Sequence, residues 1–477
     1  MKTTMISSLV ALTLVVSSFV FAGDRTSLTN LGMGRTAVSV ARGTDALGVN
    51  PANLAVPGIA PFVINLGQTD VRVSTELMSY DIYQKYFTGI DTGGGHRISY
   101  PLTDEDKNTI RDQMPDNPRT KISFDEMYGG VSLQAGVLGS FGFAMIDHGG
   151  ASITLTRGYV DMYLLGFPDN TYYDLTGTSF NTWYYREYNF SYARKIPNFL
   201  PFTKSLFVGV GYKAISGYGI FQMTKNQSNI TNSTVDDLGL NTVTANSDFS
   251  AQRTGIDLFD KMLNKVFKND DSTKIKPKPF PDPVGKGNGY DLGLTAELKN
   301  GMIVSWSVTD IGSITWDKDI IVTSGNGHYV YTGYSNDVRD SLKSVFKGVN
   351  TPGQSFKTSL PTVMHLGASV EAQQVPGLSF LPGHLLLAFE YAQGMNESLG
   401  NTTKPRFSLG TEYRIIPLLP LRTGLIMGGD DKTRWAFGFG IDFWAIDLDF
   451  ATDTFGSAFS PKSFNALSFA VGMKIRL

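Results

Sequence analysis

Few residues of the sequence have the types and spacing that catalysis requires, and the adjacent pair Asp147-His148 is the clearest of them. Hydrolysis needs a histidine, a carboxylate and a nucleophile in one place. The chain has 5 His, scattered along its length, and 0 Cys. Gly32 and Gly34 form a Gly-x-Gly without the following Lys-Ser/Thr of a phosphate-binding loop. We therefore expect no enzymatic activity, no metal and no cofactor.

Charged side chains of the C-terminal half recur at alternate positions of segments that alternate like strands. Alternate residues of a strand share one face of its sheet. Opposite charges on neighbouring strands would pair and hold the wall rigid, and a smaller role would be contact with a polar path or a ligand headgroup. The set is Glu297, Glu371, Glu390, Glu412, Asp442, Asp447 and Asp449 with Arg406, Arg414, Arg422, Arg434, Lys474 and Arg476.

The opposite face of these segments is apolar. Between residues 433 and 442 every second side chain is large and hydrophobic, and Gly438, Gly440 and Asp442 lie between them. In a soluble sandwich the apolar face would be the core. In an outer-membrane barrel it faces lipid, and the small or charged face lines the lumen.

The N-terminus favours the barrel. Residues 1–22 contain the basic Lys2, then an apolar segment, and then Ala22 just before the expected cleavage site. This is the pattern of a cleavable signal peptide. No later apolar run reaches the roughly 18 residues of a membrane helix. Charged residues are 18% and aromatic residues 12% of the chain, and the net charge of −2 gives no basic surface for nucleic acid. We expect an all-β transmembrane antiparallel barrel in the cell outer membrane.

Counting strands back from the C-terminus, with short turns on the periplasmic side and long loops outside, gives about fourteen strands. The prediction assigns 23–60 to an N-terminal hatch that plugs the lumen and 61–477 to the barrel. The count holds only if 139–165 is a single third strand, kinked at His148, Gly149 and Gly150. Extracellular loops at 225–287 and 310–362 follow the fifth and seventh strands.

Both long loops contain apolar residues at helical spacing. Each helix could cap the barrel by packing on its own loop, or the two apolar faces could form a hydrophobic groove at the mouth. The two interpretations are compatible, and neither is excluded by the sequence. The groove residues would be Ile256, Phe259, Leu263 and Phe267 from the first loop with Leu342 and Phe346 from the second.

The segments 31–37 (LGMGRTA), 44–46 (TDA) and 50–54 (NPANL) resemble the hatch of the FadL superfamily of outer-membrane barrels, which includes fatty-acid transporters and PorV-type proteins. The resemblance implies fourteen strands, a third strand whose kink opens the wall sideways, and two helix-bearing loops. It also implies a gate formed by Gly32, Gly34, Asn50, Pro51 and Ala52, which we expect near the third strand. The chain departs from the usual pattern by ending in Leu477, where such barrels usually end in Phe or Trp.

Two functions follow from the resemblance. The first is passive uptake of hydrophobic, fatty-acid-like molecules by capture at the loops and lateral release through the wall, with outer-membrane lipid and the ligand as partners. The alternative is a PorV-like adaptor or shuttle in protein secretion, with exported proteins as partners. A lumen cavity that reaches an opening in the wall would favour transport, and a filled lumen under a projecting loop platform would favour the adaptor.

Overall fold

A computed structural model describes residues 27–477, except 59, 95, 235–240, 256–280, 333–345, 376, 378–379, 381, 431–432 and 460–464. Antiparallel strands make up most of this part of the chain. None of its helices is long and apolar enough to cross a membrane. The expected signal peptide, 1–22, lies outside the described residues.

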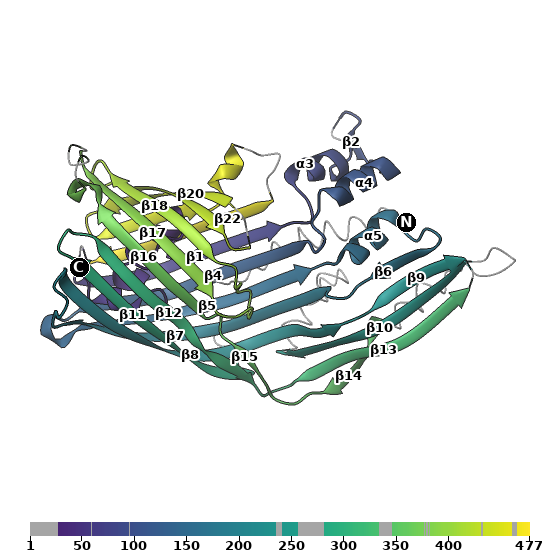
Figure 1. The fold of residues 1–477 in the computed structure, drawn as a ribbon, viewed down its shortest axis with the longest axis horizontal. Coiled ribbons are helices and arrows are strands. Elements are labelled where there is room, and N and C mark those ends of the chain that lie inside the picture. The colour runs from purple at the N-terminus through teal and green to yellow at the C-terminus, as the bar shows by residue number, and fades with distance from the viewer. Residues whose placement is uncertain are drawn as a thin grey trace.

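Fourteen strands form a closed antiparallel barrel, as the sequence predicts (Figure 1). The first strand closes the barrel by pairing with the last, from Val63 opposite Arg476 to Ser74 opposite Ala466. The barrel strands are β1 (Phe62–Thr75), β4 (Arg119–Gln134), β5 (Ser140–Thr154), β7 (Ser179–Ile196), β8 (Thr203–Asn226), β11 (Gly285–Leu298), β12 (Ile303–Trp316), β16 (Val363–Glu371), β17 (His384–Gly394), β18 (Arg406–Arg414), β19 (Leu421–Gly428), β20 (Thr433–Phe443), β21 (Ile446–Thr452) and β22 (Ala466–Arg476).

The two ends of the barrel differ in the length of their connections. At the end that holds the C-terminus, residues 444–445 join β20 to β21, and η5 (Gly136–Leu138) and η6 (Ala372–Gln374) lie in two other short connections. Long segments leave the opposite end, which we call the loop end. This asymmetry is typical of outer-membrane barrels, in which the long loops are extracellular.

The outer surface of the wall is apolar. In β20 the side chain of Ile441 is 40% exposed, whereas Asp442 beside it points inward and is buried. Burying apolar side chains stabilises a soluble fold, so a continuous exposed apolar wall indicates contact with lipid. Other large exposed side chains of the wall are Phe141, Phe190, Val210, Leu292, Leu366, Phe389, Leu409, Leu448 and Phe469. The protein is therefore an outer-membrane barrel.

The predicted loops 225–287 and 310–362 are largely sheet in the part that the structure describes. β6 (Thr171–Asp174), β9 (Asn229–Thr234), β10 (Asn241–Thr254), β13 (Ile321–Thr332) and β14 (Val349–Pro352) pair in that order beyond the barrel, and β15 (Phe356–Ser359) pairs with β12. Figure 1 shows the first five projecting from the loop end. β-Branched and aromatic residues recur along β10 and β13, and such residues favour strands over helices. The sequence analysis predicted no strands in these segments, and most of the residues that carry its helix patterns lie outside the described part of the chain.

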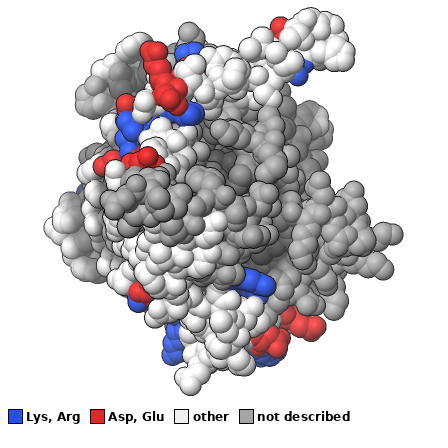
Figure 2. All heavy atoms as spheres, turned by 90° about the vertical axis from the view of Figure 1, so that its right-hand side faces the viewer, with Lys and Arg blue, Asp and Glu red and all other residues white. Residues whose placement is uncertain are grey.

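A second group of elements covers another part of the loop end. It comprises α3 (Tyr80–Ile82), η4 (Tyr83–Phe87), β2 (Ile90–Asp91), β3 (Arg97–Ile98) and α4 (Asp104–Asp112), all between β1 and β4. Ile82, Tyr86 and Ile110 form their small core. Figure 2 looks onto this end, where Lys and Arg side chains lie beside Asp and Glu at the rim of the described surface.

The third barrel strand is shorter than the sequence predicted and has no bulge at Gly149-Gly150. Strand β5 ends at Thr154, and residues 157–165 form helix α5 (Arg157–Leu165) instead of continuing the strand. The ladder between β5 and β7 is unbroken from Ser140 opposite Ala193 to Thr154 opposite Ser179. The kink predicted at His148, Gly149 and Gly150 was therefore wrong.

Gly150 has a packing role that accounts for its lack of a side chain. It lies opposite Trp183, whose ring covers the Gly150 backbone so closely that a Cβ would overlap it. Irregular positions of the described barrel include Tyr128 of β4, Leu66 of β1 and Tyr218 of β8.

We predict that Gly150→Ala destabilises the barrel by about 1–3 kcal/mol, the usual effect of overpacking. The measurement is the temperature at which the folded, fast-migrating band is lost in gel electrophoresis. Combining Gly150→Ala with Trp183→Ala should recover part of the loss, because the second change removes the colliding ring. If the stability loss of the double variant equalled the sum of the losses of the two single variants, the contact between Gly150 and Trp183 would not be the cause of the destabilisation.

Candidate functional site

The N-terminal segment occupies the lumen, as expected of a hatch. It contains α2 (Leu28–Gly32), η2 (Gly43–Ala46) and η3 (Pro51–Leu54). Nearly every residue from 27 to 54 is buried, although the segment has little regular structure. Leu28 and Leu31 pack on β21 and β22, and Leu47 and Leu54 pack on Met127 and Ile146 of the wall.

Glycines of the inner wall form the seat of the hatch. The Gly32 and Gly438 backbones approach so closely that a Cβ on either would lie 2.9 Å from the other Cα atom. Gly424 faces Met33 and Gly34 in the same way. Because glycine has no side chain, the hatch backbone lies directly on the strands. Gly142, Gly209, Gly293, Gly367, Gly410 and Gly472 also face hatch atoms at short distance.

The Asn50-Pro51-Ala52 turn lies mainly against β7, β8 and β11, the fourth to sixth barrel strands, and is seated on glycines of β8 and β11 instead of on the third strand, near which it was predicted. Its Asn50 amide donates to the Val38 carbonyl at 2.9 Å and to Thr295 Oγ1 at 3.1 Å. Gly293 of β11 leaves the space into which Asn50 fits. The turn is thus fixed by this glycine and by polar atoms of β11, for which the sequence alone gave no signal.

Glu390 of β17 is the main polar anchor of the hatch. Its Oε2 atom accepts hydrogen bonds from the backbone amides of Ala37 at 2.6 Å and Val38 at 2.8 Å. Its Oε1 atom lies 2.9 Å from His365 Nδ1 and 3.4 Å from Arg406 Nη2. A buried carboxylate with charged donors forms strong hydrogen bonds. The sequence placed Glu390 on the inner face but did not indicate its contact with the hatch.

Three further polar contacts fix the hatch to other parts of the wall. Lys474 Nζ lies 2.8 Å from Asp45 Oδ2. Arg35 contacts Asp453 at 3.3 Å, with Arg35 in the left-handed conformation at φ 65°. Gln134 donates to two carbonyls of the hatch, those of Leu54 and Val56. The hatch is therefore held by several separate polar contacts in addition to its apolar packing on the wall.

The inward charges pair across neighbouring strands, as the sequence predicts. Arg422 lies 2.6 Å from both Glu412 and Asp449. Arg414 contacts Glu412 at 2.7 Å, and Arg476 contacts Asp447 at 2.5 Å. This network fills the short-turn end of the lumen beneath the hatch and stiffens the wall there.

We predict that Arg422→Met lowers stability by about 3–5 kcal/mol, because it leaves Glu412 and Asp449 buried without their main partner. The control is Lys204→Met at the exposed Lys204–Glu297 pair, for which at most about 1 kcal/mol is expected. The measurement is the same loss of the folded band on heating. Equal losses in the two variants would show that the inner network does not stabilise the barrel.

Asp147 and His148 do not form a catalytic pair, because successive residues of β5 point to opposite faces. Asp147 shares the outer face with Phe141 and makes contacts with Arg186 at 2.5 and 2.9 Å. Hydroxyls of Tyr128 and Tyr184 donate to the same carboxylate at 3.0 and 2.6 Å. His148 lies inside, 2.6 Å from Asp125.

A second charged layer lies inside the barrel at the level of His148. Lys213 of β8 is fully buried and contacts Glu187 at 3.4 Å, Asp291 at 3.1 Å and Asp310 at 2.6 Å. His148 Nε2 lies 3.3 Å from Glu187. The alternation of β8 places Lys213 inward, but the partners come from β7, β11 and β12, so the sequence analysis did not identify this layer.

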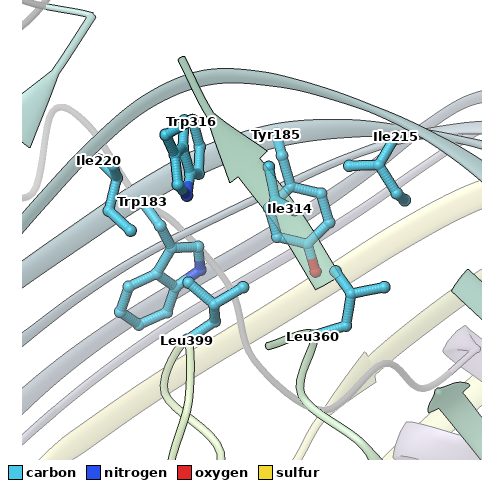
Figure 3. Close-up of a cluster of buried hydrophobic side chains, with 8 residues drawn as sticks. All are labelled: Trp183, Tyr185, Ile215, Ile220, Ile314, Trp316, Leu360 and Leu399. Atoms are coloured by element: carbon cyan, nitrogen blue, oxygen red, sulfur yellow. The ribbon is translucent and has the colours of Figure 1, made fainter. Parts of the chain in front are cut away.

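An apolar cluster lies in the lumen on the loop side of this layer. Figure 3 shows Leu360 and Leu399 pointing from their connections toward the rings of Trp183 and Tyr185. Leu399 belongs to the connection between β17 and β18 and is in the left-handed conformation at φ 48°, which is costly for a bulky residue. The other members are Ile215, Ile220, Ile314 and Trp316.

Among the described residues, three cavities at the loop side of the hatch bear on function. The first, of 110 Å³, has hatch residue Arg35 in its lining. The second, of 760 Å³, shares Arg434 and Asp430 with the first and extends toward residues 113–117. The third, of 190 Å³, is lined by Leu399 and Trp183. Together the cavities place free space next to the hatch and next to the apolar cluster.

The predicted hydrophobic groove falls mostly outside the described residues. Ile256, Phe259, Leu263, Phe267 and Leu342 are among the residues that the structure does not describe, so this prediction stays untested there. Phe346 is described. It packs on a cluster formed by Tyr173, Leu175, Ile230 and Ala245 of the projecting sheet.

The fourteen-strand barrel, its apolar outer surface and its N-terminal hatch define an outer-membrane barrel with the architecture that the FadL resemblance implied. The family model described as "Family of unknown function (DUF5723)" matches residues 54–453. The chain therefore belongs to this family. No curated protein matches the sequence.

Solved structures of similar fold include two toluene transporters and a FadL homologue. The Ralstonia pickettii toluene transporter TbuX matches with a TM-score of 0.46 and 12% identity over 96% of this chain and 100% of that chain. A Pseudomonas putida toluene transporter, TodX, matches with a TM-score of 0.45 and 10% identity over 94% of this chain and 98% of that chain. A Pseudomonas aeruginosa FadL homologue matches with a TM-score of 0.43 and 11% identity over 96% of this chain and 99% of that chain.

Proposed function

We propose that the protein is a passive outer-membrane channel for hydrophobic small molecules and is not an enzyme. The observation that carries this proposal is the position of the hatch, which lies in the lumen directly beneath cavities at the loop end. Its polar anchors, Glu390 above all, can break and re-form without covalent chemistry. Energy would come from binding and from the concentration gradient of the molecule.

The apolar cluster offers a place for the ligand. Leu399 occupies a pocket between aromatic side chains in a conformation that costs about 1 kcal/mol or more. A hydrophobic molecule that displaced Leu399 would gain contact with Trp183 and Trp316 and would relieve this strain. The molecule would then lie beside the 190 Å³ cavity, which Leu399 also lines.

The hydrophobic molecule could pass beyond the apolar cluster only after the hatch has moved. The lateral route that the resemblance implied has no kink at Gly149-Gly150 to open it, because β5 pairs continuously with β7. We therefore propose that ligand binding shifts the hatch from its glycine seat and that the molecule passes between hatch and wall.

The test is uptake of radiolabelled toluene and of radiolabelled oleate by cells that express the full chain. Faster initial uptake than in cells with the empty vector is expected for at least one of them, and Leu399→Ala should change its half-saturating concentration. The exposed Phe380→Ala is the control. Uptake equal to the empty vector for both probes, with correctly assembled barrels in the membrane, would refute the channel.

The projecting sheet favours a second candidate, a PorV-like adaptor for exported proteins. The β10–β13 ladder runs from Thr242 opposite Thr332 to Arg253 opposite Ile321, outside the closed barrel. A channel does not require such a platform. The discriminating experiment compares a strain without the gene to its parent: loss of surface-exposed proteins with unchanged uptake of hydrophobic probes would favour the adaptor.

A further inference from the structure

The connection between β17 and β18 turns inward across the lumen. The ladder between these two strands ends at Ala392 opposite Arg406. Beyond it the chain carries Leu399 into the apolar cluster, where it points toward Trp183 (Figure 3). Trp183 belongs to the fourth barrel strand, whereas β17 and β18 are the ninth and tenth, so the connection reaches far across the barrel. We call residues 395–402 the lumen lid.

The lumen lid is fastened to one neighbouring segment, residues 359–362, which we call the ledge. The ledge is itself fixed to β12, because the Leu360 amide donates to the Gly312 carbonyl at 3.0 Å and the Thr362 hydroxyl donates to the Asp310 carbonyl at 2.8 Å. Three side chains of the lid donate to backbone carbonyls of the ledge: Asn396 to Leu360 at 2.8 Å, Asn401 to Thr362 at 3.0 Å and Ser398 to Ser359 at 2.7 Å.

The tip of the lid meets other parts of the wall. Lys121 Nζ of β4 donates to the Gly400 carbonyl at 3.3 Å, and Leu399 is 7% exposed within the apolar cluster. Leu399 and Gly400 are both in the left-handed conformation, at φ 48° and 79°, which costs free energy at leucine. The closed lid thus combines individual hydrogen bonds with a strained apolar residue, and it can leave its place without disrupting the barrel ladder.

The lid lies at the boundary between two cavities. Gly400 and Asn401 line both the 110 Å³ cavity and the 190 Å³ cavity, and Leu399 lines the second. The hatch residue Arg35 lines the first. The lid therefore stands between the pocket of the apolar cluster and the space next to the hatch.

We propose that the lumen lid is a second gate, on the loop side of the hatch. It opens when the ledge hydrogen bonds are released and Leu399 withdraws from the aromatic side chains. Opening joins the two cavities into one space that reaches the hatch. This inference rests on the proposed function, because it assigns the regulation of access to the pocket in which the hydrophobic molecule would bind.

The first experiment measures how well the lid covers the pocket. Ile220 belongs to the apolar cluster, lines the 190 Å³ cavity and is 2% exposed. Ile220→Cys gives the otherwise cysteine-free chain one buried thiol, whose reaction with a maleimide is followed in the purified full chain. Asn396→Ala and Asn401→Ala should each speed this reaction about fivefold, the effect expected when one or two neutral hydrogen bonds are lost.

Two further variants guard this experiment against indirect effects. Asn300→Ala removes an exposed hydrogen bond at the short-turn end, 3.2 Å from the Met302 amide, and should leave the labelling rate unchanged. Ser398→Ala removes only the exposed ledge contact and should give a smaller increase, which covers the case of an asparagine variant that folds poorly. Labelling at the parent rate in all three lid variants, with the folded band intact, would overturn the lid.

The second experiment locks the lid. Ser359→Cys and Ser398→Cys replace two residues joined by an exposed hydrogen bond, so a short bis-methanethiosulfonate reagent can bridge them. Bridging should lower uptake of the radiolabelled probe that the cells accept, toluene or oleate, to the level of the empty vector, and dithiothreitol should restore it. Each single cysteine variant should keep its uptake after the same treatment, as should the bridged pair Lys204→Cys and Glu297→Cys at the short-turn end.

The two experiments separate the lid from the channel. Faster labelling in the lid variants of a protein that takes up neither probe would support the lid and refute the channel. Uptake at the parent rate in the bridged protein would place the lid outside the route, which would overturn the second gate while the channel stands.

Discussion

Replacing Glu390 with alanine is expected to open the lumen and raise ion conductance of the reconstituted barrel about 100-fold in time-averaged current. The variant removes the acceptor of two hatch amides, those of Ala37 and Val38, and leaves His365 and Arg406 without their shared partner. A hydrogen bond to a charged group contributes about 1.5–3 kcal/mol. Loss of these two hydrogen bonds weakens the seated state of the hatch by about 3 kcal/mol or more. Each 1.4 kcal/mol raises the population of the unseated state about tenfold.

The measurement is current through planar bilayers containing the purified protein. Glu390→Gln retains a carbonyl oxygen toward the amides and should lie between the wild type and Glu390→Ala. Glu297→Ala, at the exposed pair with Lys204, should conduct like the wild type. A silent Glu390→Ala barrel that has folded correctly would show that other contacts suffice to close the lumen.

Gly293→Val should prevent the hatch from seating. Its effect on the position of the hatch should be as large as that of Glu390→Ala. A Cβ at residue 293 would overlap Asn50 Oδ1, and further methyl groups would extend into the Asn50-Pro51 turn. Both sides of this contact are buried, so neither can withdraw without moving the hatch. We expect the barrel to form, because β11 keeps its ladder with β8 and β12, while the turn is displaced.

The readout uses the absence of cysteine from the chain. A single Ser39→Cys in the hatch, where Ser39 is 2% exposed, should react slowly with a maleimide in the parent and at least tenfold faster with Gly293→Val added. Gly129→Val is the control, because a Cβ there has its nearest neighbour at 3.6 Å. Unchanged labelling in Gly293→Val would mean that the turn does not depend on this glycine.

The sequence predicts the barrel well because each strand carries its own signal. Alternation placed Ile441 outward and Asp442 inward, and the same alternation placed Arg422 where it pairs with Glu412 and Asp449. Because short turns and long loops alternate between the two ends of such a barrel, their order along the chain then predicted the number of strands. These are local properties, which a single chain shows without knowledge of its contacts.

The errors concern contacts between distant segments. Gly149-Gly150 predicted a kink, but Gly150 is small because Trp183 lies across it, and a glycine in a strand is compatible with either cause. The Asn50-Pro51 turn was expected near the third strand, yet its seat is set by Gly293, which is more than two hundred residues away. The 110 Å³ cavity is lined by residues from the hatch, the wall and the connections, and no single segment of the sequence indicates it.

The ion pair between Asp147 and Arg186 has a consequence for how the protein is assembled. Both residues lie on the outer face of the wall, yet they are 0% and 3% exposed, because Tyr128, Tyr184 and Tyr218 surround them. Either charge alone would meet lipid hydrocarbon at a cost of several kcal/mol. Strands β5 and β7 should therefore enter the bilayer together as a preformed hairpin, with Arg186 already neutralised, so that biogenesis of this barrel proceeds through that hairpin as a single unit.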